Sequence, residues 1–530
     1  MKQQKRGTLF RLGTAALVVM TCLAWSSAAS AASKTSTGGS ITVGLDQESA
    51  CYAASFCTVS YSGASVFRSV YDWLVLPTEK APGYTPSLAE SLKSNPDFTV
   101  WTAKLRPNVK YSDGTPLTSS DIKKEFETYI AAKTSSLAFN VANVKSIDAT
   151  DPTTVVFNLT APQAPFGAML TNIPIFKPVD GLTKTSLPIS SGPFKFDSWT
   201  PNVEVKVSKN PNYWGKDKAG KQLPYLDSIT FKPITVADTR LNSLQTGDIQ
   251  LALIFDPITA AHAKGVQGVA LQNRPTANAG TLIYYNASTA PTDDVRVRQA
   301  LGYASDRNAM VASVGGGTPM SEYYVPKSPY YTAKADKLTP TNNQAKAKAL
   351  LKEYMNDPKR SDGKAVGSPV SIALNYISGR VEAQNIIQVA QKQYEAVGID
   401  ATVQTKDAAT LITDVIKGNY QAAFFAWTLM PDPYSILLRI YSAGTTQNYP
   451  HLNSPELQDI VTKMNTAATP AARKQLVDQS NTVLAQQVPM YVVMQSGVTW
   501  ARKTSNVAPL PLNYEDQQPD WQSVRALSNN

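Results

Sequence analysis

The hydrophobic positions of this chain follow two different periods, most clearly in the last third. Short apolar runs at 370–376, 399–405 and 420–427 have the length and composition of buried strands. Between them, residues 382–397 and 408–417 repeat apolar positions every three to four residues, as helices do. Strands alternating with helices in this way predict an α/β fold with a largely parallel sheet.

Shorter elements are predicted in the preceding part of the chain. Residues 99–105 alternate apolar and polar side chains with a period of two, which indicates a half-exposed strand. Thr118 followed by Asp121 predicts a capping box at the start of a helix. The acidic pair at 293–294 predicts the start of another helix, which we expect to end at the glycines 315–317.

The most informative stretch is 422–434, which reads AAFFAWTLMPDPY. Its apolar run ends at the Pro-Asp-Pro triplet 431–433, because proline has no backbone N–H to donate in a central strand. In open α/β sheets, ligands bind beyond the carboxyl ends of strands. The stretch therefore has two interpretations: a core Trp before a structural turn, which this stretch alone favours, or a pocket containing Trp427, Met430 and Asp432.

Length and composition narrow the class of protein. A chain of 530 residues exceeds one hydrophobic core and predicts three to four domains, and 43% apolar with 17% charged residues identifies a folded chain. Four Lys and Arg residues, an apolar run at 12–25 and an A-x-A site at 29–31 predict a secretory signal peptide over 1–32. With no other long apolar run, we expect an exported, soluble protein in the periplasm or cell exterior.

Charge and cysteines refine this picture. Removing the predicted signal peptide lowers the net charge from +10 to +6, and the remaining Lys and Arg form no run of five, which argues against a nucleic-acid partner. Cys51 and Cys57 predict a disulfide in an exported chain; metal binding is the alternative, but no His lies near them. Cys22 lies in the signal peptide, and because its preceding residues match a lipoprotein signal poorly, a lipid anchor there is the less favoured outcome.

The chain offers little material for catalysis. Its two histidines, His262 and His451, lie in unrelated segments, and no G-x-S-x-G, H-E-x-x-H or phosphate-loop motif occurs. One S-x-x-K, from Ser120 to Lys123, lacks the S-D-N and K-T-G partners of penicillin-recognising hydrolases and fits a chance occurrence in the first turn of a helix. We therefore predict no catalytic residue, no cofactor and no dedicated metal site, although a chelated metal remains possible as cargo. Numerous aromatic residues favour a binding protein instead.

Five groups of motifs occur in a characteristic order. They are LAES at 88–91 with LRPNVKYSDGTPL at 105–117, SGPF at 191–194 with NPNYWG at 210–215, RLNSLQTGD at 240–248, DDVRVRQAL at 293–301 with DR at 306–307, and AWT at 426–428 with DP at 432–433. With these motifs the chain resembles the solute-binding proteins of peptide/nickel-type ABC transporters, the dipeptide/oligopeptide-binding family 5. The resemblance covers essentially the whole chain after residue 32.

The resemblance implies a fold and a function. It implies an α/β, two-lobed periplasmic-binding-protein-like fold with an extra α+β domain inserted in the first lobe. Lobe one is expected at 33–72, 189–281 and 500–530, the extra domain at 73–188 and lobe two at 282–499. It also implies a monomeric extracytoplasmic receptor that captures a peptide or peptide-like solute between its lobes and delivers it to ABC permease subunits in the membrane.

The ligand class stays open on these residues. Peptide binders of the family hold the ligand's α-amino group with an Asp soon after the W-T pair, whereas here Met430 stands at that position and Asp432 matches a structural Asp-Pro. An ammonium buried without an anion is costly, so a capped or modified peptide, an oligosaccharide, an opine-like compound and a metal chelate all remain candidates. Arg380 lies where some dipeptide binders hold the ligand's carboxylate. The predicted ligand-binding residues are Tyr52, Phe56, Tyr61, Arg380, Trp427, Met430, Asp432 and Tyr449.

Two other classes of function are carried as alternatives. The first is a secreted serine hydrolase that uses Ser120 and Lys123. The second is an adhesion or signalling module that keeps the fold but serves no permease. Labelling by a β-lactam, or the lack of any bound solute, would distinguish them.

Overall fold

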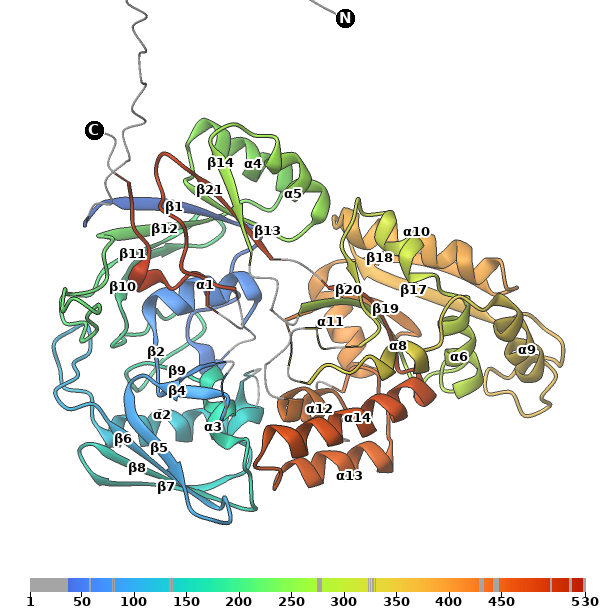
Figure 1. Cartoon of the computed structure of the whole chain (residues 1–530), viewed down its shortest axis with the longest axis horizontal. Helices are drawn as coiled ribbons and strands as arrows, with labels where there is room; N and C mark the ends of the chain where they lie inside the picture. The colour runs from blue at the N-terminus through green and yellow to red at the C-terminus, as the bar shows by residue number, and fades with distance from the viewer. Residues whose placement is uncertain are drawn as a thin grey trace, which may run out of the picture.

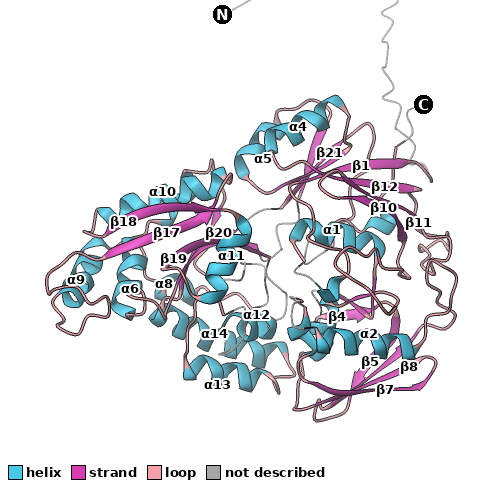
Figure 2. Cartoon of the chain, turned by 180° about the vertical axis from the view of Figure 1, so that it is seen from behind, coloured by secondary structure: helices cyan, strands magenta, loops and turns pink. Residues whose placement is uncertain are grey.

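The chain folds into two lobes that lie side by side in the computed structural model (Figure 1). The structure describes residues 37–56, 59–78, 80, 82–132, 135, 137–273, 279–322, 324, 326, 328, 330–428, 433–441, 448–495, 498–513 and 517–527. Each lobe is built on its own β-sheet, and a third sheet with its own helix lies against the first lobe (Figures 1 and 2). The two-lobed α/β fold expected from the sequence is confirmed.

Lobe one is built on a seven-stranded sheet. Its strand order is β10 (Phe194–Thr200), β11 (Glu204–Lys209), β12 (Ser228–Pro233), β1 (Ser40–Leu45), β13 (Leu251–Ile254), β21 (Thr499–Lys503) and β14 (Val269–Gln272). Alternate residues of β13 face opposite layers, as the pleat of a strand requires. Leu251 and Leu253 pack in the core that contains α1 (Tyr61–Val70), and Ala252 and Ile254 pack against α4 (Ala237–Thr246). The smaller elements of this lobe are η1 (Ala54–Phe56), α5 (Pro257–Lys264) and η4 (Trp521–Ser523).

The third sheet is antiparallel and carries one long helix. Its strand order is β5 (Ala89–Ser94), β6 (Val100–Leu105), β8 (Thr154–Leu159) and β7 (Val144–Asp151). Helix α2 (Ser119–Ala131) packs on it through Phe126, whose ring centroid lies 5.0 Å from that of Phe157. The predicted capping box is present: the Asp121 carboxylate accepts the backbone N–H and the hydroxyl of Thr118, each at 2.8 Å. Short elements complete this region: β2 (Asp72–Trp73), β3 (Val75–Pro77), β4 (Tyr84–Pro86), η2 (Ala138–Val141), α3 (Phe166–Met169), η3 (Leu170–Asn172) and β9 (Pro174–Ile175).

Lobe two is a sheet between two helical layers. Its strand order is β16 (Thr318–Pro319), β20 (Met490–Gln495), β15 (Ala279–Tyr285), β19 (Ala422–Thr428), β17 (Ser371–Ile377) and β18 (Asp400–Lys406). Ile283 and Tyr285 of β15 pack in one core with three helices, α6 (Val295–Ala304), α9 (Gln344–Met355) and α10 (Val381–Glu395). Leu282 and Tyr284 pack in the opposite core, which holds α11 (Ala408–Lys417), α12 (Pro433–Tyr441), α13 (Pro455–Met464) and α14 (Pro470–Gln487). The remaining helices of the lobe are α7 (Arg307–Ala312) and α8 (Lys334–Leu338).

The expectation of a largely parallel sheet is wrong for half of this lobe. Strand β17 pairs in parallel with β18 and β19, as the strand–helix alternation indicates. Strands β15 and β20 pair antiparallel with their neighbours. These two strands join the sheet from distant parts of the chain, so the local alternation of strands and helices does not determine their direction.

The helix expected between the acidic pair at 293–294 and the glycines at 315–317 is two helices. α6 ends at Ala304, and Ser305 adopts an extended backbone with φ −79° and ψ 126°. Asp306 then begins α7 by accepting the backbone N–H of Asn308 at 2.9 Å. Asp306 is a typical N-cap residue that the sequence already shows. The apolar positions continue on both sides of it, so the sequence alone predicts one helix where the structure has two.

Within the described residues, no helix has the length and apolar character needed to cross a membrane.

Candidate functional site

The two lobes meet where strands from both sheets end. Asp46 directly follows β1 of lobe one, and Arg380 lies three residues beyond the end of β17 of lobe two. The Nη2 atom of Arg380 lies 3.6 Å from Oδ2 of Asp46, so an ion pair joins the lobes. The carboxyl ends of β1 and β17 therefore face each other, which is the usual place for a ligand in α/β proteins. We name the residues around this pair, Asp46, Arg240, Asp256, Thr281, Arg380 and Glu382, the inter-lobe junction.

Lobe one contributes two carboxylates and a buried guanidinium to the inter-lobe junction. Asp46 accepts a hydrogen bond from the Ser62 hydroxyl, and Asp256 caps α5 by accepting the backbone N–H of Thr259 at 2.6 Å. Arg240 is 3% exposed and donates from Nε to the carbonyl of Leu253 at 2.8 Å. Burial lowers the pKa of Arg240, and the nearby Asp46 and Asp256 oppose this change. The carboxylates thus keep this buried cation charged.

Lobe two contributes Arg380 and Glu382 from the start of α10. The Thr281 hydroxyl donates to Oε1 of Glu382 at 3.1 Å. Burial raises the pKa of Glu382 to about 7; the bond from Thr281 and the charge of Arg380 act against this rise, and Asp256 adds to it. Thr281 lies opposite Ala426 of β19 in the sheet, so the Glu382 carboxylate lies beside the carboxyl end of that strand.

Among the predicted site residues that the structure describes between 422 and 449, Trp427 is the one that lies at this end of β19. Trp427 lies in β19, where its backbone is opposite that of Gly280 in the neighbouring strand β15. Met430 and Asp432 lie outside the described residues. Tyr449 is half-buried, and its ring centroid lies 5.8 Å from that of Tyr284, on the strand next to β19.

The predicted aromatic residues near the N-terminus lie in different surroundings. Tyr52 is 1% exposed and packs in the core of lobe one, edge-on against Trp199 with 4.9 Å between centroids. Tyr61 is half-buried at the start of α1, with its ring centroid 5.3 Å from that of Phe255. Phe56 is half-buried at the end of η1 and lines a cavity beside α2. Tyr52 thus has its ring surface covered by the core, whereas Tyr61 and Phe56 keep part of theirs open.

Sequence reasoning missed Asp46, Asp256 and Glu382. Asp46 follows the first strand and Glu382 stands in the first turn of a helix, and both positions carry acids for ordinary reasons of turn and helix chemistry. A signal existed for Asp46, because polar residues directly after strands mark the ligand edge of an α/β sheet. No local pattern shows that Glu382 and Asp256, far apart in the chain, approach each other.

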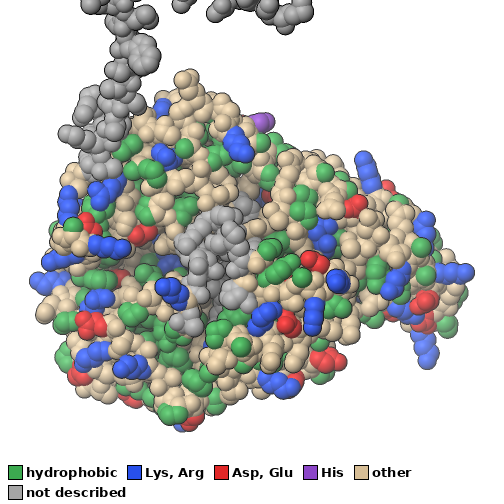
Figure 3. Space-filling view, in the orientation of Figure 1, with side chains coloured by type: hydrophobic (Ala, Val, Ile, Leu, Met, Phe, Trp, Pro, Cys, Tyr) green, Lys and Arg blue, Asp and Glu red, His purple; other side chains and the backbone are tan. Residues whose placement is uncertain are grey.

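A second contact joins the two halves of the molecule away from the inter-lobe junction. The backbone N–H of Ala164 donates to the carbonyl of Asn465 at 2.7 Å, and the Gln163 amide lies 3.5 Å from the Tyr434 hydroxyl. The extra sheet region therefore contacts lobe two through the helices α12 and α13. On the face shown in Figure 3, Lys and Arg side chains are scattered over both lobes and mixed with Asp and Glu.

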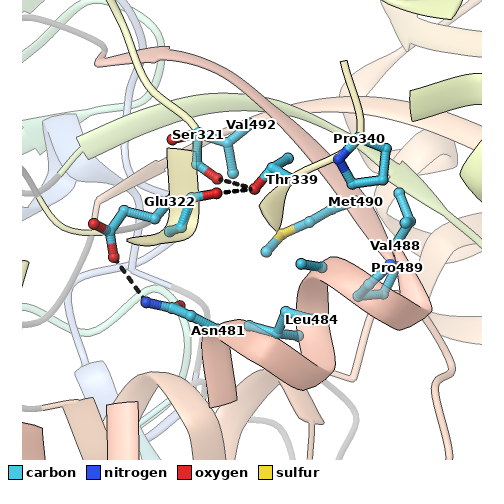
Figure 4. A pocket seen from close by; sticks show the side chains of 12 residues that line it. Ser321, Glu322, Thr339, Pro340, Asn481, Leu484, Val488, Pro489, Met490 and Val492 are labelled. Atoms are coloured by element: carbon cyan, nitrogen blue, oxygen red, sulfur yellow. Dashed lines mark hydrogen bonds between the residues drawn. The ribbon is translucent and has the colours of Figure 1, made fainter. Parts of the chain in front are cut away.

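Lobe two also contains a small pocket (Figure 4). It measures about 30 Å³ and is lined by Ser321, Glu322, Ala335, Thr339, Pro340, Asn481, Leu484, Ala485, Val488, Pro489, Met490 and Val492. Glu322 points toward Asn481, whose amide donates to Oε2 at 2.9 Å, and burial raises the pKa of Glu322 to about 8. A cavity of this size holds about one or two waters and is too small for a solute.

Two larger hollows contain none of the inter-lobe junction residues in their linings. One, of about 380 Å³, lies on lobe two between Arg307, Asp336 and Asn342. The other, of about 180 Å³, lies between Phe56, α2 and residues 176–182. Neither lies between the two main sheets, so movement of the lobes would not enclose a solute there.

The hydrolase alternative finds no support in the geometry. Lys123 donates from Nζ to the carbonyl of Ile147 at 2.6 Å and pairs with Glu127 at 3.4 Å. These contacts direct the Lys123 ammonium to Ile147 and Glu127, and Ser120 is exposed on the same helix. Among the described residues, no group of three or more His, Cys, Asp or Glu side chains forms a metal site.

Comparisons with known proteins agree on one family. The model of the bacterial extracellular solute-binding proteins, family 5 Middle, matches residues 83–448. The glutathione-binding protein GsiB of Shigella boydii serotype 4 is 30% identical over 343 residues, which are 62% of this chain and 62% of that protein. The chain thus matches less than two thirds of the length of this relative.

Solved structures share the fold over almost the whole chain. The oligopeptide-binding protein AppA from Bacillus subtilis, in complex with a nonapeptide, has a TM-score of 0.80 at 22% identity and covers 94% of this chain and 100% of its own. AgaA from A. tumefaciens R10, in complex with agropinic acid, has a TM-score of 0.79 at 23% identity over 93% and 99% of the two chains. These relatives are binding proteins and not enzymes. The family model covers well over half of the chain, and this protein belongs to the bacterial extracellular solute-binding proteins of family 5.

Proposed function

We propose that this protein is the extracytoplasmic receptor of an ABC importer and that it captures a peptide or peptide-like solute at the inter-lobe junction. The observation that carries the proposal is the ion pair between Asp46 and Arg380, which brings the strand ends of both lobes together. The glutathione-binding and oligopeptide-binding names of similar proteins support a peptide-like solute. The partner would be the permease subunits of the importer.

Capture follows from a difference in affinity between two arrangements of the lobes. A solute that touches both lobes binds the closed arrangement more tightly than the open one, and this difference shifts the population toward closure. Arg380 suits this role because its side chain is 41% exposed and, among the described residues, Asp46 at 3.6 Å is the carboxylate that pairs with its guanidinium. A ligand carboxylate would form shorter, bidentate hydrogen bonds with the same group.

The remaining predicted residues complete the proposed site. Phe56, Tyr61, Trp427, Met430 and Tyr449 would form its apolar wall, with Asp432 as a further polar anchor. Tyr52 supports this wall as a core residue, because its ring is already covered by lobe one.

Export and the division into domains belong to the same proposal. We infer a cleaved signal peptide at 1–32 and a disulfide between Cys51, which is fully buried, and Cys57, which lies outside the described residues. We also propose the domain boundaries given above, with two small changes. Strand β15 is assigned to lobe two from residue 279 and β21 to lobe one from residue 499, because each strand pairs within the sheet of that lobe. The receptor would act as a monomer without nucleic acid.

A binding panel tests the proposed function. Native mass spectrometry of the purified protein should show the mass of one subunit, either alone or with a co-purifying small molecule bound. Thermal shift against peptides, glutathione, oligosaccharides, opines and metal chelates should give a rise in Tm for the peptide-like class, because a ligand of the folded state alone stabilises it.

The outcome of this panel separates the alternatives. A rise in Tm only for sugars, opines or chelates would replace the solute class while keeping the receptor. No bound mass and no shift with any class would contradict the receptor and favour the adhesion or signalling module. The same mass spectra, before and after reduction, count the subunits and test the disulfide.

A further inference from the structure

One carboxylate at the inter-lobe junction has an oxygen that the protein leaves unused. Oε1 of Glu382 accepts the Thr281 hydroxyl at 3.1 Å. Among the described residues, no hydrogen bond or ion pair reaches Oε2. The side chain is half-buried, and Oε2 is not among the buried oxygens without a partner, so this oxygen stays open to solvent or to a solute at the inter-lobe junction.

The position of Glu382 at a helix start does not explain this arrangement. The helix dipole stabilises a negative charge in the first turn, but it gives no reason for a hydrogen bond to another element. Glu382 is bonded instead to Thr281, on a strand of the sheet that the helix covers. A dipole role would also lower the pKa of the carboxyl, whereas burial raises it to about 7.

The charges around Glu382 come from both lobes. From lobe one, Asp256 at the start of α5 disfavours a negative charge on Glu382; from lobe two, Arg380 favours it. Arg380 is already engaged by Asp46 across the junction. Arg240, the other cation nearby, donates to the backbone carbonyls of Leu253 and Ile234. No cation of the described residues is therefore committed to Glu382.

We propose that Glu382 is the specificity-determining residue that holds a cationic group of the solute, a primary ammonium, at the inter-lobe junction. The inference rests on the proposed function and narrows its solute to a peptide-like amine. An ammonium donates three hydrogen bonds, and the free oxygen of Glu382 accepts one of them while the charges attract. With Arg380 two residues away on the same helix start, the junction suits a zwitterion: ammonium at Glu382 and carboxylate at Arg380.

This role predicts how affinity changes with pH. Glu382 holds an ammonium only when ionised, and its free carboxyl has a pKa of about 7. Binding of the cation lowers that pKa, so a proton leaves on binding at neutral pH and affinity falls as the pH drops below 7. The loss approaches about tenfold for each pH unit below that value.

Amine-blocked probes test the inference. We would measure Kd for glutathione and trialanine, each with its N-acetylated form, by calorimetry on the purified protein. The wild type should bind the free amines about 10- to 100-fold more tightly than the acetylated forms. Glu382→Gln should remove this preference and flatten the pH dependence, because the amide has the shape of the acid without its charge.

A matched control lies on the same helix. Glu395, exposed in the last turn of α10, is replaced as Glu395→Gln and should leave both the preference and the pH profile unchanged. The wild-type pH profile, and the proton release seen in buffers of different ionisation enthalpy, need no variant and remain decisive if Glu382→Gln folds poorly.

The outcomes distinguish a failure of the proposed role of Glu382 from a failure of the proposed receptor function. Equal binding of free and acetylated probes, tighter binding at lower pH, or an unchanged preference in Glu382→Gln would overturn the role of Glu382 while the receptor stands. Binding of only uncharged solutes in the panel would do the same. A wild type that binds no probe and no member of the wider panel would overturn both.

Discussion

At the residue scale, Asp72 shows what several of the sequence motifs are for. Its carboxylate is 4% exposed and accepts the indole N–H of Trp214 at 2.7 Å and the hydroxyl of Ser191 at 3.3 Å. The guanidinium of Arg106 stacks 4.7 Å from the Trp214 ring centroid. Three motifs that are far apart in the chain thus meet at one buried acid, away from the inter-lobe junction. They hold lobe one to the extra sheet region.

Asp72 makes a specific prediction about stability and pH. Burial raises the pKa of Asp72 to about 6, against about 3.9 in an unfolded chain. Its ionisation therefore costs more in the folded state, and the protein loses stability as the pH rises from 4 to 6, by roughly 3 kcal/mol from this group. Asp72→Asn should remove that slope, measured as the free energy of unfolding against pH. Asp148→Asn, at an exposed position, is the control; parallel curves for Asp72→Asn and wild type would contradict the prediction.

At the scale of elements, helix α2 begins with the same capping hydrogen bonds that its sequence predicts. Asp121 accepts two hydrogen bonds from Thr118, and Pro152 accepts the backbone N–H of Ser119 at 2.9 Å. The helix therefore begins with its end groups satisfied both locally and by the neighbouring β7–β8 turn.

Removing the cap should loosen this one helix. Asp121→Ala leaves the Thr118 N–H without its acceptor and should cost about 1 kcal/mol, measured by faster hydrogen exchange of the α2 amides. Glu127→Ala, which breaks only an exposed pair with Lys123 on the same helix, should cost about 0.5 kcal/mol or less. Equal effects of the two substitutions would show that the cap contributes no more than a surface pair.

At the scale of the whole molecule, the two lobes contact each other at the inter-lobe junction and through α12 and α13. The ion pair at the junction is half-exposed on the arginine side, and ion pairs of this kind contribute at most about 1 kcal/mol. A bias of this size leaves the lobes able to separate, which a receptor that must admit and release a solute requires.

Breaking this pair should therefore open the unliganded protein. Asp46→Asn should shift the population toward separated lobes by up to about fivefold, measured as a larger radius of gyration in X-ray scattering. Asp180→Asn breaks a pair of 2.9 Å with Lys124 that lies outside lobe two, and it should leave the radius unchanged. Identical scattering of Asp46→Asn and wild type would mean that the pair does not bias closure.

The sequence by itself determined the features that depend on neighbours in the chain. Two examples are the capping box at Thr118 and the parallel strands β17, β18 and β19. Both could be predicted because helix caps and the periodicity of apolar residues depend on only a few neighbouring residues. The local signals also placed strand β19 correctly, so the carboxyl edge of the lobe two sheet could be located in advance.

Only the tertiary structure decided which distant residues meet. The antiparallel direction of β15 and β20, the burial of Tyr52 and the approach of Asp46 to Arg380 depend on contacts between segments hundreds of residues apart. Glu382 is the clearest case, because its sequence context is that of an ordinary helix start. Burial and the charge of Asp256 raise the pKa of its carboxyl, and these surroundings come from segments that are distant in the sequence.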